Sequence, residues 1–471
     1  MRLRSDLSPE LKYHALIIET AAREAGLDFH DVTFELLDAR NVNGVAAYGG
    51  FPTRYPSWRF GMDFERLQKG YDWGLSKIYE LVINTDPVIA YLVRSNSLLE
   101  QKLVMAHVFG HADFFKHNVC FAGTDTGMLD TMGRHAATVR RIIDSEGQDR
   151  TEAFIDAALS LDGLIDPYRL RNQRAGVSGP RAALSDRSLR LIESMSDRPS
   201  SPELRREVDE GEALSGETPT LDVLGFLERH APLEHWQREI LRIVRAEAYY
   251  FAPQRLTKIA NEGWACYWHS KLLTGGILEP EELIDYADVH SGATAAAPGQ
   301  LNPYRLGLKL MRYAEERGED MFLLRRIHSD VSLIDALVDE EFVLRYHGLT
   351  LADTRQARDQ GLDWTAWKEK LLGELAWGGQ PRIELIGVDR LGRGELELRH
   401  HHDGRDLQVS TASETLKNLA TVWNGPVQLT SRVDDRLRRM TVADGEFEIS
   451  DVEPESTDPE VGAGEDARAT G

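Results

Sequence analysis

Residues 98–116 read LLEQKLVMAHVFGHADFFK. Apolar side chains occur on nearly every face of the helix that this segment predicts, so the helix should be buried rather than lie on the surface. His107 and His111 are one helical turn apart and share one face of it. A buried polar group without a partner costs a few kcal/mol, so each imidazole must meet a carboxylate, a carbonyl, a water or a metal ion. The segment therefore predicts a helical core with a polar centre.

A second polar group lies in another apolar segment, NEGWACYWH at residues 261–269. On the helix predicted there, Glu262, Cys266 and His269 stand at positions i, i+4 and i+7 and share one face. Two imidazoles from one helix and a carboxylate from another are ligands that a divalent ion, zinc above all, uses in proteins. The expected metal ligands are His107, His111 and Glu262.

Metal-assisted hydrolysis also requires a proton acceptor. Metalloproteases with the pattern His-Glu-x-x-His have a general base beside the first histidine, whereas this chain has Val108 there. A carboxylate-rich centre in a helical bundle is a second option, although its repeated Glu-x-x-His signature is absent. The expected catalytic residues are Glu247 and His269. The polar residues expected to line the pocket are Glu80, Asp113, Lys116, Asp125, Asn261 and His290.

Composition and charge restrict the class of protein. A chain of 471 residues is too long for one simple core and should divide into two or three units. The formal charge of −22 disfavours binding to nucleic acid. No stretch approaches the ~20 apolar residues that span a bilayer, the first residues are charged, and two cysteines do not make a disulfide framework. These features predict a soluble cytoplasmic protein.

The patterns along the chain predict a mainly α-helical protein with a small C-terminal α+β domain. An N-terminal helical part of the main domain spans 1–174, with a loop rich in Gly, Pro and aromatic residues at 41–61. Residues 175–220 are rich in Ser, Pro, Gly and charge and predict a flexible linker or insertion. The remaining units expected are the C-terminal helical part at 221–375, the α+β domain at 380–450 and a disordered acidic tail at 451–471.

Capping and breaking residues predict where some elements begin and end. Asn302 and Pro303 should start a helix. Thr220 is expected as an N-cap, and the helix from about residue 234 should end before Pro253. Residues 438–449 alternate like a strand.

Several blocks of this sequence resemble the SpoVR family, the stage V sporulation protein R family. They are HVFGHADFFK at 107–116, NEGWACYWH at 261–269, HSGATAAAPGQLNPYRLG at 290–307 and PTRYPSWRFG at 52–61, together with the pattern around His328-Ser-Asp330. The resemblance extends over about residues 1–450. It implies a role in a sporulation, stress or cell-envelope programme, and partnership with a PrkA-type serine kinase and a von Willebrand factor A-like protein.

Two functional hypotheses follow. The first is a metal-dependent hydrolase with a zincin-like His/Glu site. The second is a non-catalytic regulatory or scaffold protein that acts with these partners, in which the buried histidines and Glu262 form a hydrogen-bonded network. The residue at Val108 favours the second hypothesis. The burial of several polar groups in apolar helices favours the first, because such burial is costly without a purpose.

Overall fold

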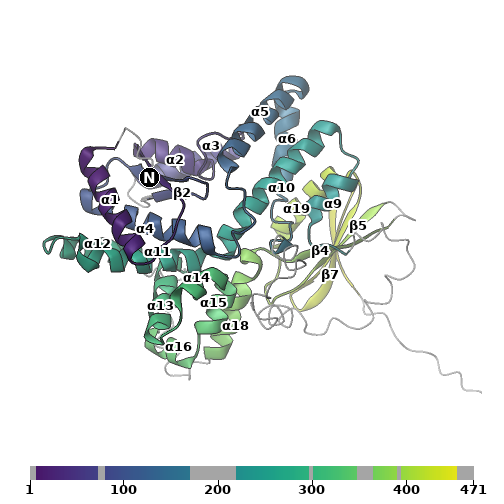
Figure 1. Ribbon diagram of the computed structural model, residues 1–471. Helices are drawn as coiled ribbons and strands as arrows, with labels where there is room; N and C mark the ends of the chain where they lie inside the picture. Colours follow the sequence, from purple (N-terminus) through teal and green to yellow (C-terminus); the bar gives the residue numbers. More distant parts are fainter. Residues whose placement is uncertain are drawn as a thin grey trace, which may run out of the picture.

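The computed structural model describes residues 7–72, 80–169, 219–295, 301–346, 364–389 and 394–452. The protein is mainly α-helical and ends in a small domain with a five-stranded sheet, as predicted (Figure 1). Nearly all of the linker predicted at 175–220, and the acidic tail beyond residue 452, lie outside the described residues. Within the described ranges, no helix combines the length and the apolar character needed to cross a membrane.

Helices and short strands alternate in the first part of the chain, and helices alone form the middle part. Up to residue 169 the elements are α1 (Pro9–Glu24), β1 (Val32–Leu37), α2 (Ala39–Ala47), α3 (Trp58–Asp72), β2 (Glu80–Ile83), β3 (Val88–Val93), α4 (Leu98–His117), α5 (Met128–Glu146) and α6 (Gln148–Leu159). From residue 219 to 379 they are α9 (Val223–His230), α10 (His235–Leu256), α11 (Lys258–Leu272), η3 (Leu273–Ile277), α12 (Glu282–Ala293), α13 (Pro303–Glu316), α14 (Met321–Ile327), α15 (Asp330–Leu337), α16 (Glu340–Tyr346), α18 (Trp364–Leu375) and η4 (Ala376–Gly379). The C-terminal domain contains β4 (Ile383–Asp389), β5 (Glu395–His400), α19 (Val409–Trp423), β6 (Val427–Val433), β7 (Arg436–Ala443) and β8 (Glu446–Asp451).

Helix α4 is the centre of the first core. Every residue from 101 to 115 is buried, as the all-round apolar pattern predicts. Ser97 and Glu100 form a capping box that fixes its first turn. The helix packs against α1, against α11, and against a small sheet of order β1-β3-β2, which the sequence patterns do not predict.

Small residues allow three helices to pack with their backbones in contact. A Cβ atom on Gly110 of α4 would lie 2.7 Å from the Cα of Ala265 on α11. A Cβ atom on Gly263 of α11 would lie 2.4 Å from the carbonyl carbon of Gly307 on α13. A residue with a side chain would clash at these distances. Helices α4, α11 and α13 can therefore approach closely only because these positions are glycine. The polar residues of α4 and α11 are thereby brought face to face.

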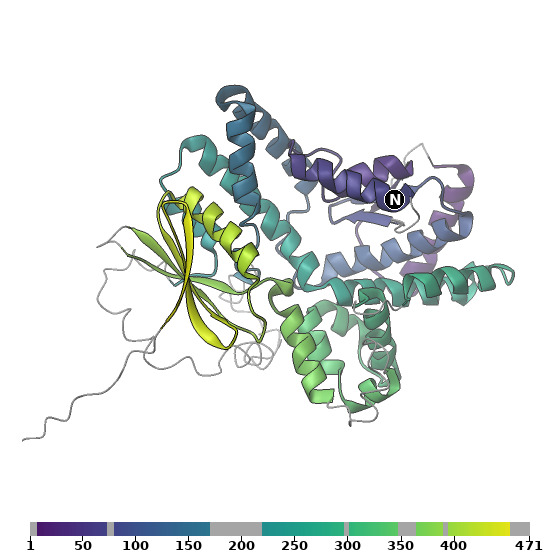
Figure 2. The ribbon, with the colours of Figure 1, turned by 180° about the vertical axis from the view of Figure 1, so that it is seen from behind.

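A second core joins the C-terminal domain to helices of the main domain. The sheet has the order β4-β5-β6-β7-β8, in which β5 and β6 are parallel and connected by α19, and the other pairs are antiparallel. It lies at the opposite end of the molecule from α12 (Figures 1 and 2). Buried side chains shared by this core include Phe154, Phe226, Leu241, Leu385, Leu398 and Leu429. Because buried apolar residues of α6, α9 and α10 lie in one core with those of the α+β domain, that domain is part of the molecule's packing.

Local details differ from expectation in the first part of the chain. The loop predicted at 41–61 is confined to 48–57, because α2 and α3 extend into both of its ends. Thr220 is not an N-cap, since its backbone pairs with that of Leu385 in β4. Asp222 caps α9 instead, by accepting a hydrogen bond from the backbone N–H of Gly225.

Two boundaries later in the chain also differ from the prediction, and one agrees with it. Helix α10 continues through Pro253 to Leu256, where both side chains are buried in the core and offset the lost backbone hydrogen bond. The strand predicted at 438–449 is two antiparallel strands, β7 and β8, because Asp444 and Gly445 form a turn with positive φ. The start of α13 is confirmed, since Asn302 caps the helix that Pro303 begins.

Candidate functional site

The polar residues of α4 and α11 meet where these helices cross. Nε2 of His107 lies 3.3 Å from Oε2 of Glu262, and Nε2 of His111 lies 3.5 Å from the same oxygen. The three donor atoms lie within 4.8 Å of one another. Both imidazoles are buried, and the Glu262 side chain is only 16% exposed. The three residues predicted as metal ligands are therefore brought together.

The charge of Glu262 suits cation binding. Burial alone would raise the pKa of this carboxyl group, but the imidazoles of His111 and His107 lower it below its ordinary range. Glu262 is therefore an ionised carboxylate with two imidazole nitrogens directed at one of its oxygens.

Asn261 determines which nitrogen of His111 faces this carboxylate. Its Oδ1 accepts a hydrogen bond from Nδ1 of His111 over 2.9 Å. This contact occupies Nδ1, so Nε2 is the nitrogen of His111 that faces Glu262 and could bind an ion. Asn261, one of the residues expected to line the pocket, thus lies beside His111 and orients its imidazole.

His107 also contacts a line of further histidines. Its Nδ1 lies 2.9 Å from Nδ1 of His269, and Nε2 of His269 lies 3.0 Å from Nδ1 of His290 on α12. Burial lowers the pKa of His269 well below its ordinary value, and neighbouring His107 and His290 lower it further. Burial and Arg312 lower the pKa of His290 as well. Both imidazoles are therefore neutral at pH 7, and the structure brings both predicted residues into line with His107.

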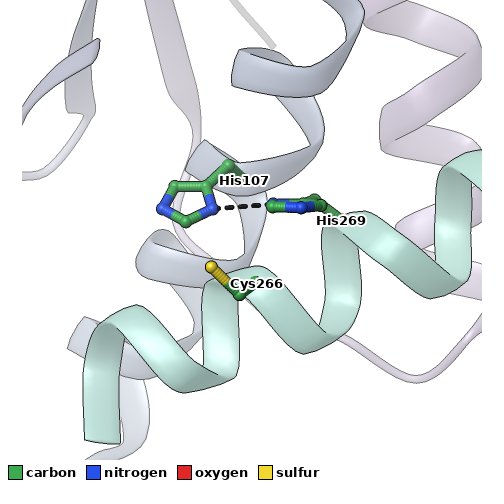
Figure 3. Close-up of side chains that lie close together, drawn as sticks. All are labelled: His107, Cys266 and His269. Carbon is green, nitrogen blue, oxygen red and sulfur yellow. Dashed lines mark hydrogen bonds between the residues drawn. The ribbon is translucent and has the colours of Figure 1, made fainter. Parts of the chain in front are cut away.

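Cys266 is a further neighbour of these histidines, and it is not among the ligands predicted from the sequence. Figure 3 shows its sulfur directed from α11 toward the rings of His107 and His269. Donor atoms of these three residues lie within 4.8 Å of one another, and all three residues are buried. The i, i+4 and i+7 spacing of Glu262, Cys266 and His269 was the signal for it, since that spacing places all three on the face that meets α4.

Two contacts from outside α4 and α11 support the site. Tyr304 of α13 stacks on His107 with ring centroids 6.0 Å apart. Asp330 of α15 accepts hydrogen bonds from the backbone N–H groups of Ile259 (2.9 Å) and Ala260 (2.8 Å), and so caps α11 just before Glu262. The spacing arguments do not single out either residue, because their partners lie far away along the chain.

Glu247 is not in the histidine site. Its Oε2 accepts hydrogen bonds from Nη2 of Arg54 (2.5 Å) and the hydroxyl of Tyr55 (3.2 Å), and its Oε1 lies 3.0 Å from Nδ1 of His135. Glu247 is only 3% exposed. These partners place Glu247 in a separate ionic cluster between α10, α5 and the loop at 48–57.

Two residues predicted near the pocket make structural contacts at the end of α4. Asp113 is fully buried, pairs with Nε of Arg325 at 2.8 Å and accepts a hydrogen bond from the Trp264 indole over 2.9 Å. Lys116 pairs with Asp28 at 2.6 Å. Asp113 therefore connects α4 with α11 and α14. Lys116 connects α4 with the segment before β1.

Asp125, another residue expected to line the pocket, also makes structural contacts away from the histidines. Asp125 accepts hydrogen bonds from the backbone N–H of Gly127 and the hydroxyl of Thr131, each over 2.8 Å. It therefore stabilises the turn before α5. The backbone of Glu80 begins β2, where it pairs with Leu92 of β3.

Two protein-family models match this chain. A family model described as "SpoVR like protein" matches residues 7–376, and one described as "SpoVR-like C-terminal domain" matches residues 381–434. A relative from Escherichia coli (strain K12), described as "Uncharacterized protein YcgB", is 28% identical over 472 residues, which cover 89% of this chain and 91% of that protein. No solved structure matches the chain significantly. Because the first model alone matches well over half of the chain, the protein belongs to the SpoVR family.

Proposed function

We propose that the protein is a metal-dependent hydrolase in which His107, His111 and Glu262 bind a divalent ion, zinc above all. The supporting observation is the distance between the donor atoms. Zinc lies about 2.0–2.2 Å from its ligand atoms, which puts two ligands of a tetrahedral site about 3.4 Å apart. The two imidazole nitrogens lie 3.3 and 3.5 Å from Oε2 of Glu262.

The surroundings of these donors fit a bound ion. Nε2 of His107 and Nε2 of His111 converge on one oxygen of an ionised carboxylate. The other nitrogen of each ligand imidazole is held by a protein partner, Asn261 or His269, as is usual for histidines that bind metals. A divalent ion bound there would supply a Lewis acid that lowers the pKa of a water molecule.

Of the two predicted catalytic residues, His269 is the one whose position supports a role. When Nε2 of His107 is the ligand, its Nδ1–H donates to Nδ1 of His269. The Nε2–H of His269 then donates to Nδ1 of His290. This line of imidazoles connects the ligand to α12 and offers neutral groups that can accept a proton.

The test uses metal analysis of untagged, full-length protein reconstituted with zinc and then desalted. We expect about one zinc per chain in the wild type and in His117→Ala, a control on the same helix whose side chain pairs with Asp28. His107→Ala and His111→Ala should each lose the ion. The wild type should also hydrolyse p-nitrophenyl acetate or bis(p-nitrophenyl) phosphate faster than His107→Ala does.

Two results would contradict the proposal. Zinc at well below one equivalent in the wild type would reject the site. Bound zinc without hydrolysis above the His107→Ala background would reject the hydrolase function and leave a metal-binding protein.

The second candidate is a regulatory or scaffold protein that acts with a PrkA-type serine kinase and a von Willebrand factor A-like protein. It is favoured because both ring nitrogens of His107 and of His111 already lie close to protein groups. A wild type that binds no zinc and is as stable after chelation as before would support this alternative. For either function we propose a cytoplasmic location and a sporulation, stress or cell-envelope programme.

A further inference from the structure

We propose that His107, Cys266 and His269 form a second metal position, which takes a soft or borderline ion through nitrogen and sulfur ligands. This position uses Nδ1 of His107, whereas the site proposed above uses Nε2. It does not require the first position to bind an ion, so the two proposals can fail independently.

The geometry brings three donors to one buried point. Nδ1 of His107 lies 2.9 Å from Nδ1 of His269, and the donor atoms of the set, Sγ of Cys266 included, lie within 4.8 Å of one another. Exposure is 2% for His107, 0% for Cys266 and 3% for His269. Figure 3 shows the sulfur on the same side of α11 as the two rings. Thiolate and imidazole are the ligands of closed zinc sites and of softer ions.

The remaining ring nitrogens have the acceptors that such a site needs. When both Nδ1 atoms present lone pairs to an ion, the hydrogens are on Nε2. Nε2 of His107 then faces the carboxylate of Glu262 at 3.3 Å, and Nε2 of His269 faces Nδ1 of His290 at 3.0 Å. A carboxylate or another acceptor behind each ligand imidazole is the common arrangement around protein-bound metals. Glu262 is thus a ligand in one position and a hydrogen-bond acceptor in the other.

The tautomer of His107 selects between the two positions. A neutral imidazole presents only one lone pair, so His107 serves the Glu262 position through Nε2 or the Cys266 position through Nδ1. One position offers two nitrogens and an oxygen, and the other offers two nitrogens and a sulfur. We therefore expect harder ions to favour the first position and softer ions to favour the second.

Cobalt(II) spectroscopy of the metal-free, full-length protein tests this inference. Thiolate coordination gives a near-ultraviolet sulfur-to-cobalt charge-transfer band, which coordination by nitrogen and oxygen does not give. The chain has two cysteines, so Cys120→Ser is the matched control. We expect the band in the wild type, in Cys120→Ser and in Glu262→Gln, and its loss in Cys266→Ser.

Each outcome decides the question. If the wild type is saturated with cobalt and shows no such band, the inference is wrong, whatever the variants show. That result would not decide whether the Glu262 position binds an ion. A band that disappears in Cys120→Ser, or that persists in Cys266→Ser, also overturns it. A band that survives in Glu262→Gln supports the second position even where the first fails. Thermal unfolding and circular dichroism of Cys266→Ser, compared with Cys266→Ala, separate loss of the ligand from loss of the fold.

Discussion

Glu247 shows at the residue scale how a buried charge in this protein depends on one partner. Glu247→Gln would leave Arg54, whose side chain is 10% exposed, without its carboxylate. Removing one partner of a buried ion pair costs about 3–5 kcal/mol. We expect a loss of that size in the free energy of unfolding measured with urea, with zinc content unchanged. Unchanged stability together with lost hydrolysis would instead indicate the catalytic role that the sequence predicts.

Asp330 makes stability depend on pH. Burial raises its pKa to about 7, against the two backbone N–H groups that lower it. Because this value exceeds the ordinary one, ionisation favours the unfolded state as pH rises. The stability advantage of the wild type over Asp330→Asn should be largest below about pH 4, decrease as pH rises, and level off above about pH 7. Urea unfolding of both proteins across this range measures the difference, and a difference that stays constant or grows with pH would contradict the assignment.

The packing of α4 on α11 makes a prediction at the scale of elements. Gly110→Ala would place a Cβ atom 2.7 Å from the backbone of Ala265, which cannot move without shifting α11. Overpacking of this kind costs about 1–3 kcal/mol or more. Gly133→Ala on α5 is the matched control, because its Cβ would meet nothing within 4 Å. We expect Gly110→Ala to lower stability and zinc affinity together, and Gly133→Ala to leave zinc affinity unchanged and stability unchanged or slightly higher. Equal behaviour of the two variants would refute the role of this contact.

The contact between Gly110 and Ala265 shows which part of the site can be predicted from the sequence and which part cannot. Helical periodicity alone puts His107 with His111, and Glu262 with His269, because those spacings lie within single helices. That α4 meets α11 at these faces depends on Gly110 and other contacts between distant parts of the chain, which no local pattern contains. Glu247 illustrates the consequence, because its partner Arg54 lies 193 residues away along the chain.

The molecule has two hydrophobic cores, and their boundary does not coincide with the boundary between the units predicted from the sequence. The sequence predicts a helical main domain and a separate α+β domain, and the fold class is right. However, α6, α9 and α10 share their core with the C-terminal sheet, whereas α1, α4, α11 and α13 form the core around the histidines. Periodicity shows that each element has an apolar face, but it does not show which element covers that face.

Removal of the C-terminal domain should therefore unfold more than that domain. A chain truncated after residue 380 would uncover apolar side chains of α6, which packs against α19, and Phe226 of α9, which is fully buried and contacts Trp423. Uncovering each such side chain costs about 1.5–3 kcal/mol, so the loss of several of them is comparable to a total stability of about 5–15 kcal/mol. We expect aggregation in size-exclusion chromatography and loss of helical circular dichroism beyond the share of α19. A chain truncated after residue 452 is the control and should match the wild type. A monomeric chain ending at residue 380, with the helices of both cores intact, would show that the second core is stable without the sheet.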